Sequence, residues 1–174
     1  MLRYNFPILL VAGVLVVAGF LTWIVVGQVK KTVRPMVLGH WGDALHVCPS
    51  EDFPGDVLEQ AVDLWRGDGF DITIGCSVPF ASIVIDPTVD IRDSVDDVGI
   101  QHGVTKVTQT ADGEITAAET RMLPGPTVAW TAHELGHQLG FGHPNFCPSG
   151  HVMHPHNPGI HDFRGHSAAT YYDP

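Results

Sequence analysis

Residues 131–144 read TAHELGHQLGFGHP, and this stretch decides how the rest of the chain is interpreted. It lies in a longer segment whose apolar residues recur with the spacing of one helical face, at Val128, Ala132, Leu135 and Leu139. The pattern predicts a helix over about residues 127–139, anchored on a core by that apolar stripe. Gly136 costs the middle of such a helix about 1 kcal/mol relative to alanine. Its presence there indicates close approach of another backbone.

The three histidines of the stretch have the spacing of ligands to one metal ion. On a helix, His133 and His137 lie one turn apart on the same face. Gly140 is suited to end the helix in a left-handed conformation, which turns the chain so that His143 reaches back. Three neutral imidazoles leave one tetrahedral position open, as a catalytic zinc ion requires and a closed structural zinc site lacks.

Glu134 follows the first ligand but lies off the ligand face, so its carboxylate is available as a base. Zinc lowers the pKa of water to about 7, and Glu134 can take the proton and pass it to a leaving amine. No glutamate follows Glu134, and Asp162 is an alternative to His143 as the third ligand. Three unrelated histidines on a helix are the remaining interpretation.

The segment before this helix is predicted to contain a strand, a helix, two further strands and a hairpin, in that order. Short apolar or alternating runs predict strands at 45–47, 70–74 and 81–85, and apolar spacing predicts a helix over 54–65. A turn signal at 111–113 separates Gly103–Thr108 from Ile115–Met122, which predicts a hairpin. This order is typical of a mixed α+β domain with a core of its own.

The first part of the chain is apolar. Pro7–Gly27 contains no charged residue and is long enough to cross a hydrocarbon core of about 30 Å. We interpret it as a transmembrane helix or signal anchor, with a cleaved signal peptide and a secreted domain as the alternative. Residues 1–6 are then a short tail, 28–43 a linker and 44–174 the catalytic domain. The flanking basic residues, by a margin of one charge, favour a cytoplasmic domain.

The charge of the chain excludes one class of partner. All 19 acidic residues lie after position 40, whereas four of the nine basic residues lie at or before position 34. Such an acidic domain repels phosphate backbones, so we expect no nucleic-acid binding.

The segment His133–His143 matches the pattern HExxHxxGxxH, and here the chain resembles the metzincin zinc peptidases. Those enzymes carry a methionine in a tight turn beneath the metal. SGHVMHP at Ser149–Pro155 is similar to that Met-turn, with Met153 as its methionine. The short interval between His143 and Met153 is most similar to the matrixin branch. The resemblance covers about residues 44–172.

The resemblance implies a twisted mixed sheet with an antiparallel edge strand, an active-site helix and a Met-turn. It implies a zinc metalloendopeptidase with Zn²⁺ on His133, His137 and His143, Glu134 as general base and Met153 supporting the site. An extended protein or peptide substrate would lie along the edge strand, within Gly103–Gln109. Residues 154–160 would form the wall of the main specificity pocket. We expect a monomer.

Two other functions remain open. A catalytically inactive relative would keep zinc and bind a protein at the membrane, although such a module has no need of the Glu134 carboxylate. A zinc-stabilised structural module would unfold when the metal is removed.

The cysteines bear on the compartment. By the resemblance, the strands that end near Cys48 and Cys76 are parallel neighbours, which implies a disulfide, with two buried thiols as the alternative. A disulfide indicates an oxidising compartment, and with the habitat of the family it favours an extracytoplasmic domain. Cys147 is interpreted as a loop thiol or alternative disulfide partner, and less readily as a thiolate near the zinc.

Two further groups of residues were weighed as metal ligands. The family often binds calcium before the edge strand, where oxygen ligands are available from Asp86, Asp90, Asp93, Asp96 and Asp97. Their spacing matches no calcium motif, so a solvated acidic loop is the preferred interpretation. That loop offers only His102 as a nitrogen ligand, and we predict no second zinc. We expect most histidines of the tail to lie at the surface, namely His151, His154, His156, His161 and His166.

Overall fold

The computed structural model describes residues 36–42, 44–89, 102–144, 147–164 and 166. The predicted tail 1–6, the apolar segment Pro7–Gly27 and the first part of the linker lie outside these residues, as do Asp90, Asp93, Asp96 and Asp97. Within the described ranges, no helix combines the length and the apolar character needed to span a membrane.

A five-stranded sheet forms the centre of the domain, in the order β3-β2-β4-β6-β5. Its strands are β2 (Leu45–Pro49), β3 (Ile72–Ile74), β4 (Phe80–Ile85), β5 (Gly103–Gln109) and β6 (Ile115–Met122). The pairs β2–β3, β2–β4 and β4–β6 are parallel, and β5 is antiparallel to β6 at the edge. The domain is therefore mixed, compatible with the predicted α+β class, and its hairpin is the predicted one.

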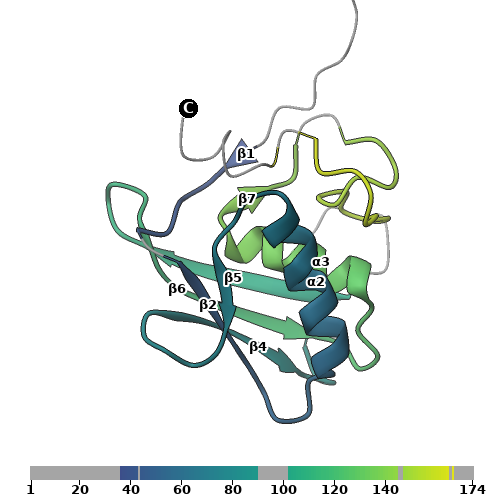
Figure 1. The fold of residues 1–174 in the computed structure, drawn as a ribbon, viewed down its shortest axis with the longest axis horizontal. Coiled ribbons are helices and arrows are strands. Elements are labelled where there is room, and N and C mark those ends of the chain that lie inside the picture. Colours follow the sequence, from purple (N-terminus) through teal and green to yellow (C-terminus); the bar gives the residue numbers. More distant parts are fainter. Residues whose placement is uncertain (1–35, 43, 90–101, 145–146, 165, 167–174) are drawn as a thin grey trace, which may run out of the picture. The chain divides into compact units, whose positions relative to one another are not determined.

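Two helices lie side by side in Figure 1, namely α2 (Gly55–Gly67) and α3 (Val128–Gln138). Pro54 precedes α2, where its missing N–H needs no partner. Thr127 caps α3 by accepting a hydrogen bond from the Trp130 N–H at 3.3 Å. Both helices lie within a residue or two of the predicted bounds.

The core lies between one face of the sheet and the two helices. Alternate residues of the strands are buried on that face, among them Leu45, Val47, Ala81 and Ile83. Trp65 of α2 is fully buried in this layer, and its indole N–H donates to the Ala132 carbonyl of α3 at 2.8 Å. This bond and the surrounding apolar contacts hold α3 in a fixed position on the sheet.

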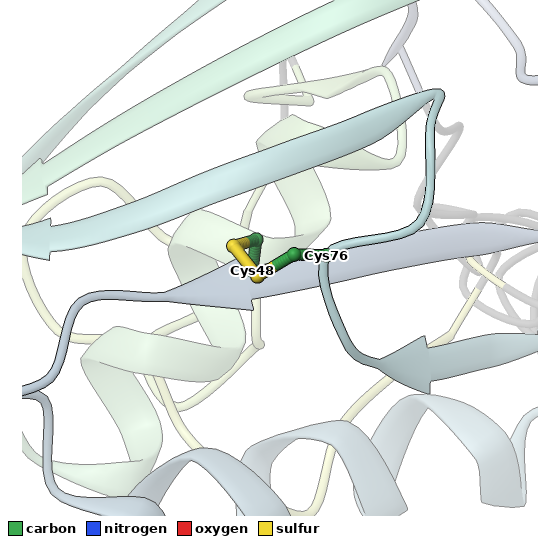
Figure 2. The surroundings of a disulfide bond; sticks show 2 residues. All are labelled: Cys48 and Cys76. Atoms are coloured by element: carbon green, nitrogen blue, oxygen red, sulfur yellow. A yellow bond between two sulfur atoms is a disulfide. The ribbon is translucent and has the colours of Figure 1, made fainter.

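The disulfide joins the end of β2 to the loop that follows β3 (Figure 2). Cys48 and Cys76 have their Cα atoms 4.6 Å apart, within the range that a disulfide bridges. Because β2 and β3 are parallel neighbours, their carboxyl ends meet at the same edge of the sheet. The bond therefore ties two strands together where the chain leaves the sheet.

Part of the predicted linker belongs to the folded domain. The short strand β1 (Met36–Val37) pairs antiparallel with β7 (Phe141–Gly142), and the Leu38 N–H donates to the Gly140 carbonyl at 2.7 Å. Trp41 is buried, and its indole N–H donates to the carbonyl of Gln138 at 2.8 Å. Residues 36–42 thus pack against the end of α3, and the folded domain begins before residue 44.

One predicted strand is shorter in the structure. Phe70 and Asp71 precede β3 and do not belong to it, because the Phe70 N–H donates to the Trp65 carbonyl at 3.2 Å and closes the end of α2. The alternating pattern of 70–74 carries no signal of this closure.

Candidate metal centre

Three imidazoles converge at the carboxyl end of α3. The Nε2 atom of His133 lies 3.2 Å from Nε2 of His137 and 3.2 Å from Nε2 of His143. All the ligand atoms of this cluster lie within 4.8 Å of one another, close enough to hold one metal ion. The structure therefore brings together the three histidines that the sequence pattern singles out.

The tautomers of these rings show that the cluster fits a cation. The Nδ1 atom of His133 lies 2.8 Å from the Val152 carbonyl, and that of His137 lies 2.7 Å from the Phe141 carbonyl. A carbonyl oxygen only accepts, so both Nδ1 atoms carry the hydrogen and both Nε2 atoms present lone pairs. Two lone pairs facing each other at 3.2 Å repel unless a cation lies between them. The carbonyl partners are the kind that orient metal-binding histidines.

Two of the imidazoles, those of His133 and His143, are also held in their neutral form. Burial, together with the nearby His137, places the pKa of His133 well below its usual value. Burial and His137 likewise lower the pKa of His143 to about 4. Neutral imidazole is the form that binds metals, so at neutral pH little free energy is spent on deprotonation before a metal binds.

Gly140 makes the turn that brings the third histidine back. Its φ of +95° lies in the left-handed region, where a residue with a side chain is strained. A Cβ at this position would also collide with the carbonyl group of Gly39. The chain can therefore leave α3 sharply, form β7 and place His143 beside the other two ligands.

Glu134 lies beside the histidines and is nearly inaccessible to solvent, with 3% of its surface exposed. The hydroxyl of Thr105 donates to its Oε2 atom at 2.6 Å. Burial raises the pKa of Glu134, while the nearby His137 and the hydrogen bond from Thr105 act in the opposite direction. A buried carboxyl group whose affinity for protons is increased is suited to general-base chemistry.

The turn containing Met153 packs against α3, and the Val152 carbonyl beside it is the partner of His133. The His154 N–H donates to the His151 carbonyl at 2.9 Å and closes the turn, and Met153 within it is fully buried. A Cβ on Gly136 would collide with the Met153 sulfur and would lie 2.8 Å from the Trp65 ring. Glycine at 136 therefore lets α3 approach this turn closely, but the atoms that need the space belong to side chains and not to the predicted backbone.

A cavity of about 220 Å³ opens over the site. The histidine cluster and Glu134 line its floor, and β5 lines one side with Gly103, Val104, Thr105, Val107 and Gln109. The remaining lining residues are Leu38, Trp130, Gly140, Phe141 and Pro155. Pro155 is the member of the predicted pocket wall 154–160 that lines this cavity. The cavity therefore runs along the edge strand of the sheet.

Several candidate ligands have other roles. The carboxylate of Asp162 binds Arg164, with its Oδ2 atom 2.6 Å from Nη2. Among the described residues, the third member of the cluster with His133 and His137 is His143 and not Asp162. Asp86 accepts hydrogen bonds from Thr88. Cys147 is a free, half-buried thiol, and burial followed by the charge of Asp162 raises its pKa to about 11, so it is not a thiolate at neutral pH.

The expectation for the tail histidines is wrong at two positions. His151 and His166 are fully buried, with ring centroids 4.9 Å apart, whereas His156 and His161 are exposed and His154 is half-buried. The backbone carbonyl of Arg164 accepts a hydrogen bond from both buried rings, at 3.2 and 3.1 Å. This shared partner offsets the cost of burying two polar side chains.

Five residues near the site were not identified from the sequence. Thr105, Thr120 and Gln138 form a hydrogen-bonded chain to Glu134. Trp130 lies with its ring centroid 5.6 Å from that of His133, and His102 packs on the Trp130 indole at 4.6 Å. An alternating strand and a helical stripe indicate one face each, but neither indicates which residues face each other across them.

No protein-family model matches the chain, and no curated protein matches it.

Proposed function

We propose that this protein is a zinc-dependent metalloendopeptidase of the metzincin type, most similar to the matrixin branch. The observation that carries the proposal is the meeting of three imidazole Nε2 atoms with the buried Glu134 carboxylate in one cavity. The site combines an open three-histidine ligand set with a base of its own, which a closed structural site lacks.

His133, His137 and His143 would hold the zinc ion, since imidazole is a preferred zinc ligand. When bound there, zinc supplies Lewis acidity, which polarises a peptide carbonyl and makes water a stronger acid. Val152 and Phe141 keep two of the ligands in the metal-binding tautomer through their carbonyl groups. The fully buried Met153 supports the ligands from below, in the place of the family's Met-turn methionine.

Glu134 acts as the general base and then as the acid. Its carboxylate takes the proton of the attacking water and later delivers that proton to the amine of the leaving peptide. The rise of its pKa on burial makes the carboxylate a stronger base than an exposed glutamate.

The edge strand β5 binds the substrate main chain. It pairs with β6 on one side, and in the part of the chain that the structure describes no strand pairs with its other side. An extended peptide can add to that free edge with backbone hydrogen bonds, while its side chains enter the cavity. This arrangement selects unfolded or flexible segments of proteins as substrates.

The Cys48–Cys76 disulfide supports a domain in an oxidising, extracytoplasmic compartment, because such bonds are rare in the cytosol. With Pro7–Gly27 as an uncleaved anchor, the enzyme would act at a membrane surface.

The proposal is tested by comparing Glu134→Gln with the wild-type chain on casein or a quenched peptide library. We expect about 10²- to 10⁴-fold lower turnover with the zinc content unchanged, because the variant keeps all three ligands and loses only the base. Glu51→Gln, at an exposed turn residue, is the matched control and should retain full activity.

Equal activity in wild type and Glu134→Gln would overturn the assignment of the base. A zinc-loaded wild-type protein that binds peptides without cleaving them would instead support the inactive binding module.

A further inference from the structure

A chain of hydrogen bonds runs from the core to the carboxylate of Glu134. The register of the hairpin places Thr105 of β5 opposite Thr120 of β6, and their hydroxyl oxygens lie 2.7 Å apart. On one side, Thr105 lies 2.6 Å from Oε2 of Glu134. On the other, Nε2 of Gln138 lies 2.8 Å from the Thr120 hydroxyl. Two residues of α3 are thus linked through two residues of the sheet.

The donors and acceptors of the two hydrogen bonds made by the Gln138 side chain can be assigned first. Nε2 of Gln138 also lies 2.9 Å from the Ser82 carbonyl, which can only accept a hydrogen bond. The amide group of Gln138 must therefore present its nitrogen here, because the opposite orientation would bring two carbonyl oxygens together. The second N–H of the same nitrogen then donates to the Thr120 hydroxyl.

The direction of the later bonds is fixed by the ionised carboxylate of Glu134, which can only accept. The Thr105 hydroxyl therefore donates its one hydrogen to Oε2 of Glu134. Because that hydrogen is used, the bond between the two threonines must be donated by Thr120 and accepted by Thr105. All the donors point toward the carboxylate.

This order gives the two oxygens of Glu134 different roles. Oε2 already accepts the hydrogen bond from Thr105, which favours Oε1 as the oxygen that takes up a proton. Gly103 of β5 makes room for that oxygen, since a Cβ on Gly103 would lie 3.0 Å from Oε1. Glu134 and Gly103 both line the cavity.

We propose that Thr105, backed by Thr120 and Gln138, is a positioning residue that holds Oε2 and leaves Oε1 as the oxygen that exchanges protons with the substrate. This inference rests on the proposed role of Glu134 as the base. Thr105 acts through Glu134, and its hydroxyl carries no proton to the reaction. A base held in one orientation needs no reorganisation when the proton moves.

The competing explanation is that the chain only satisfies buried polar groups between α3 and the sheet. Thr120 and Gln138 are fully buried, and a buried hydroxyl or amide without partners is costly. In the described part of the chain, Oε1 of Gln138 has no hydrogen-bond partner, so satisfaction of polar groups is incomplete. A packing role predicts a loss of stability, whereas a positioning role predicts a loss of turnover.

The test compares Thr105→Val and Thr105→Ser in the full chain loaded with zinc. Valine keeps the shape and removes the hydroxyl, so we expect kcat to fall about 10- to 100-fold with KM within about twofold of wild type. Serine keeps the hydroxyl and should restore kcat to within about threefold of wild type. The matched control Thr73→Val, at an exposed residue of β3, should leave kcat unchanged.

An unchanged kcat in Thr105→Val would overturn the inference, as would a loss in Thr105→Ser equal to that in Thr105→Val. A fall in active fraction that tracks lowered thermal stability, with normal turnover per folded molecule, would show a packing role alone.

A crystal structure of Thr105→Val separates this inference from the proposed function. We expect the Glu134 carboxylate to rotate or to adopt two orientations, while the three histidines stay in place. If the wild-type chain shows no peptidase activity, the proposed function fails. The carboxylate orientation still decides whether Thr105 positions it, and an unmoved carboxylate would refute the inference.

Discussion

At the residue scale, the buried pair His151 and His166 shows how a polar side chain becomes part of the core. The Nδ1 atom of His166 donates to the Arg164 carbonyl, and its ring packs against Phe141 with centroids 4.8 Å apart. The Nδ1 atom of His151 accepts from the Met153 N–H at 3.1 Å, so this imidazole supports the turn beneath the site. Charging either ring would disturb the packing next to Met153.

His166 makes the stability of the domain sensitive to acid. Burial lowers its pKa to about 4; His151 acts in the same direction, and the Arg164 carbonyl and Asp162 act against it. Below about pH 6.5 the unfolded chain takes up a proton that the folded domain does not, so the free energy of unfolding falls until about pH 4. The expected contribution is at most about 3 kcal/mol.

Urea unfolding of the metal-free protein at pH 7 and pH 4 measures this effect. His166→Phe should lose less stability between the two pH values than the wild type, because the buried titrating group is gone. His133 and His143 have lowered pKa values in both proteins and cancel in the comparison. The exposed His161→Phe should behave like wild type, and an equal acid loss in His166→Phe would contradict the assignment.

At the scale of the elements, two connections hold the ends of strands that propensity alone would leave frayed. The β1–β7 pair ties the chain before β2 to the turn that carries His143. The disulfide ties the carboxyl end of β2 to the loop after β3, across a sequence separation of 28 residues. The disulfide is covalent, and its contribution to the free energy of unfolding can be measured without changing the histidine cluster.

Replacing both Cys48 and Cys76 by alanine should lower the free energy of unfolding by about 3 kcal/mol, because the unfolded chain gains the freedom of the opened loop. Chemical denaturation under non-reducing conditions measures the difference. Cys147→Ala is the control, and as a half-buried free thiol it should cost about 1 kcal/mol or less. Equal losses in the two proteins would show that the disulfide does not stabilise the domain.

At the scale of the whole molecule, the site and the core are separate centres of organisation. The core packs α2 and α3 against the sheet around Trp65, whose ring stacks on Phe141 with centroids 5.7 Å apart. The histidine cluster lies at the carboxyl end of α3 and uses none of the core side chains as ligands. A metal bound at this cluster would therefore be an addition to a domain that has its own apolar interior and a disulfide.

Removal of the metal should abolish activity while leaving the domain folded. After treatment with a chelator, we expect the far-ultraviolet circular dichroism to be retained. The melting temperature should fall only as far as the lost free energy of metal binding requires. Adding zinc back should restore activity. Loss of secondary structure on chelation would instead support the zinc-stabilised structural module.

The sequence by itself determined the features that depend on local spacing. The one-turn interval between His133 and His137, the stop at Gly140 and the turn signal at 111–113 each predict structure over a few residues. The structure has a helix, a left-handed turn and a hairpin there. The three candidate ligands follow from the same spacing, because a single helix and the turn after it supply all of them.

Only the tertiary structure decided which distant residues meet. Thr105 reaches Glu134 across 29 positions because of the register of β5 on β6 and the place of α3 on the sheet, and neither has a signal within one segment. Burial of His151 and His166 likewise depends on the Arg164 carbonyl, which both rings reach only in the folded domain. Periodicity indicates which face of an element is buried, whereas a contact between two elements depends on how both pack, and that is a property of the whole chain.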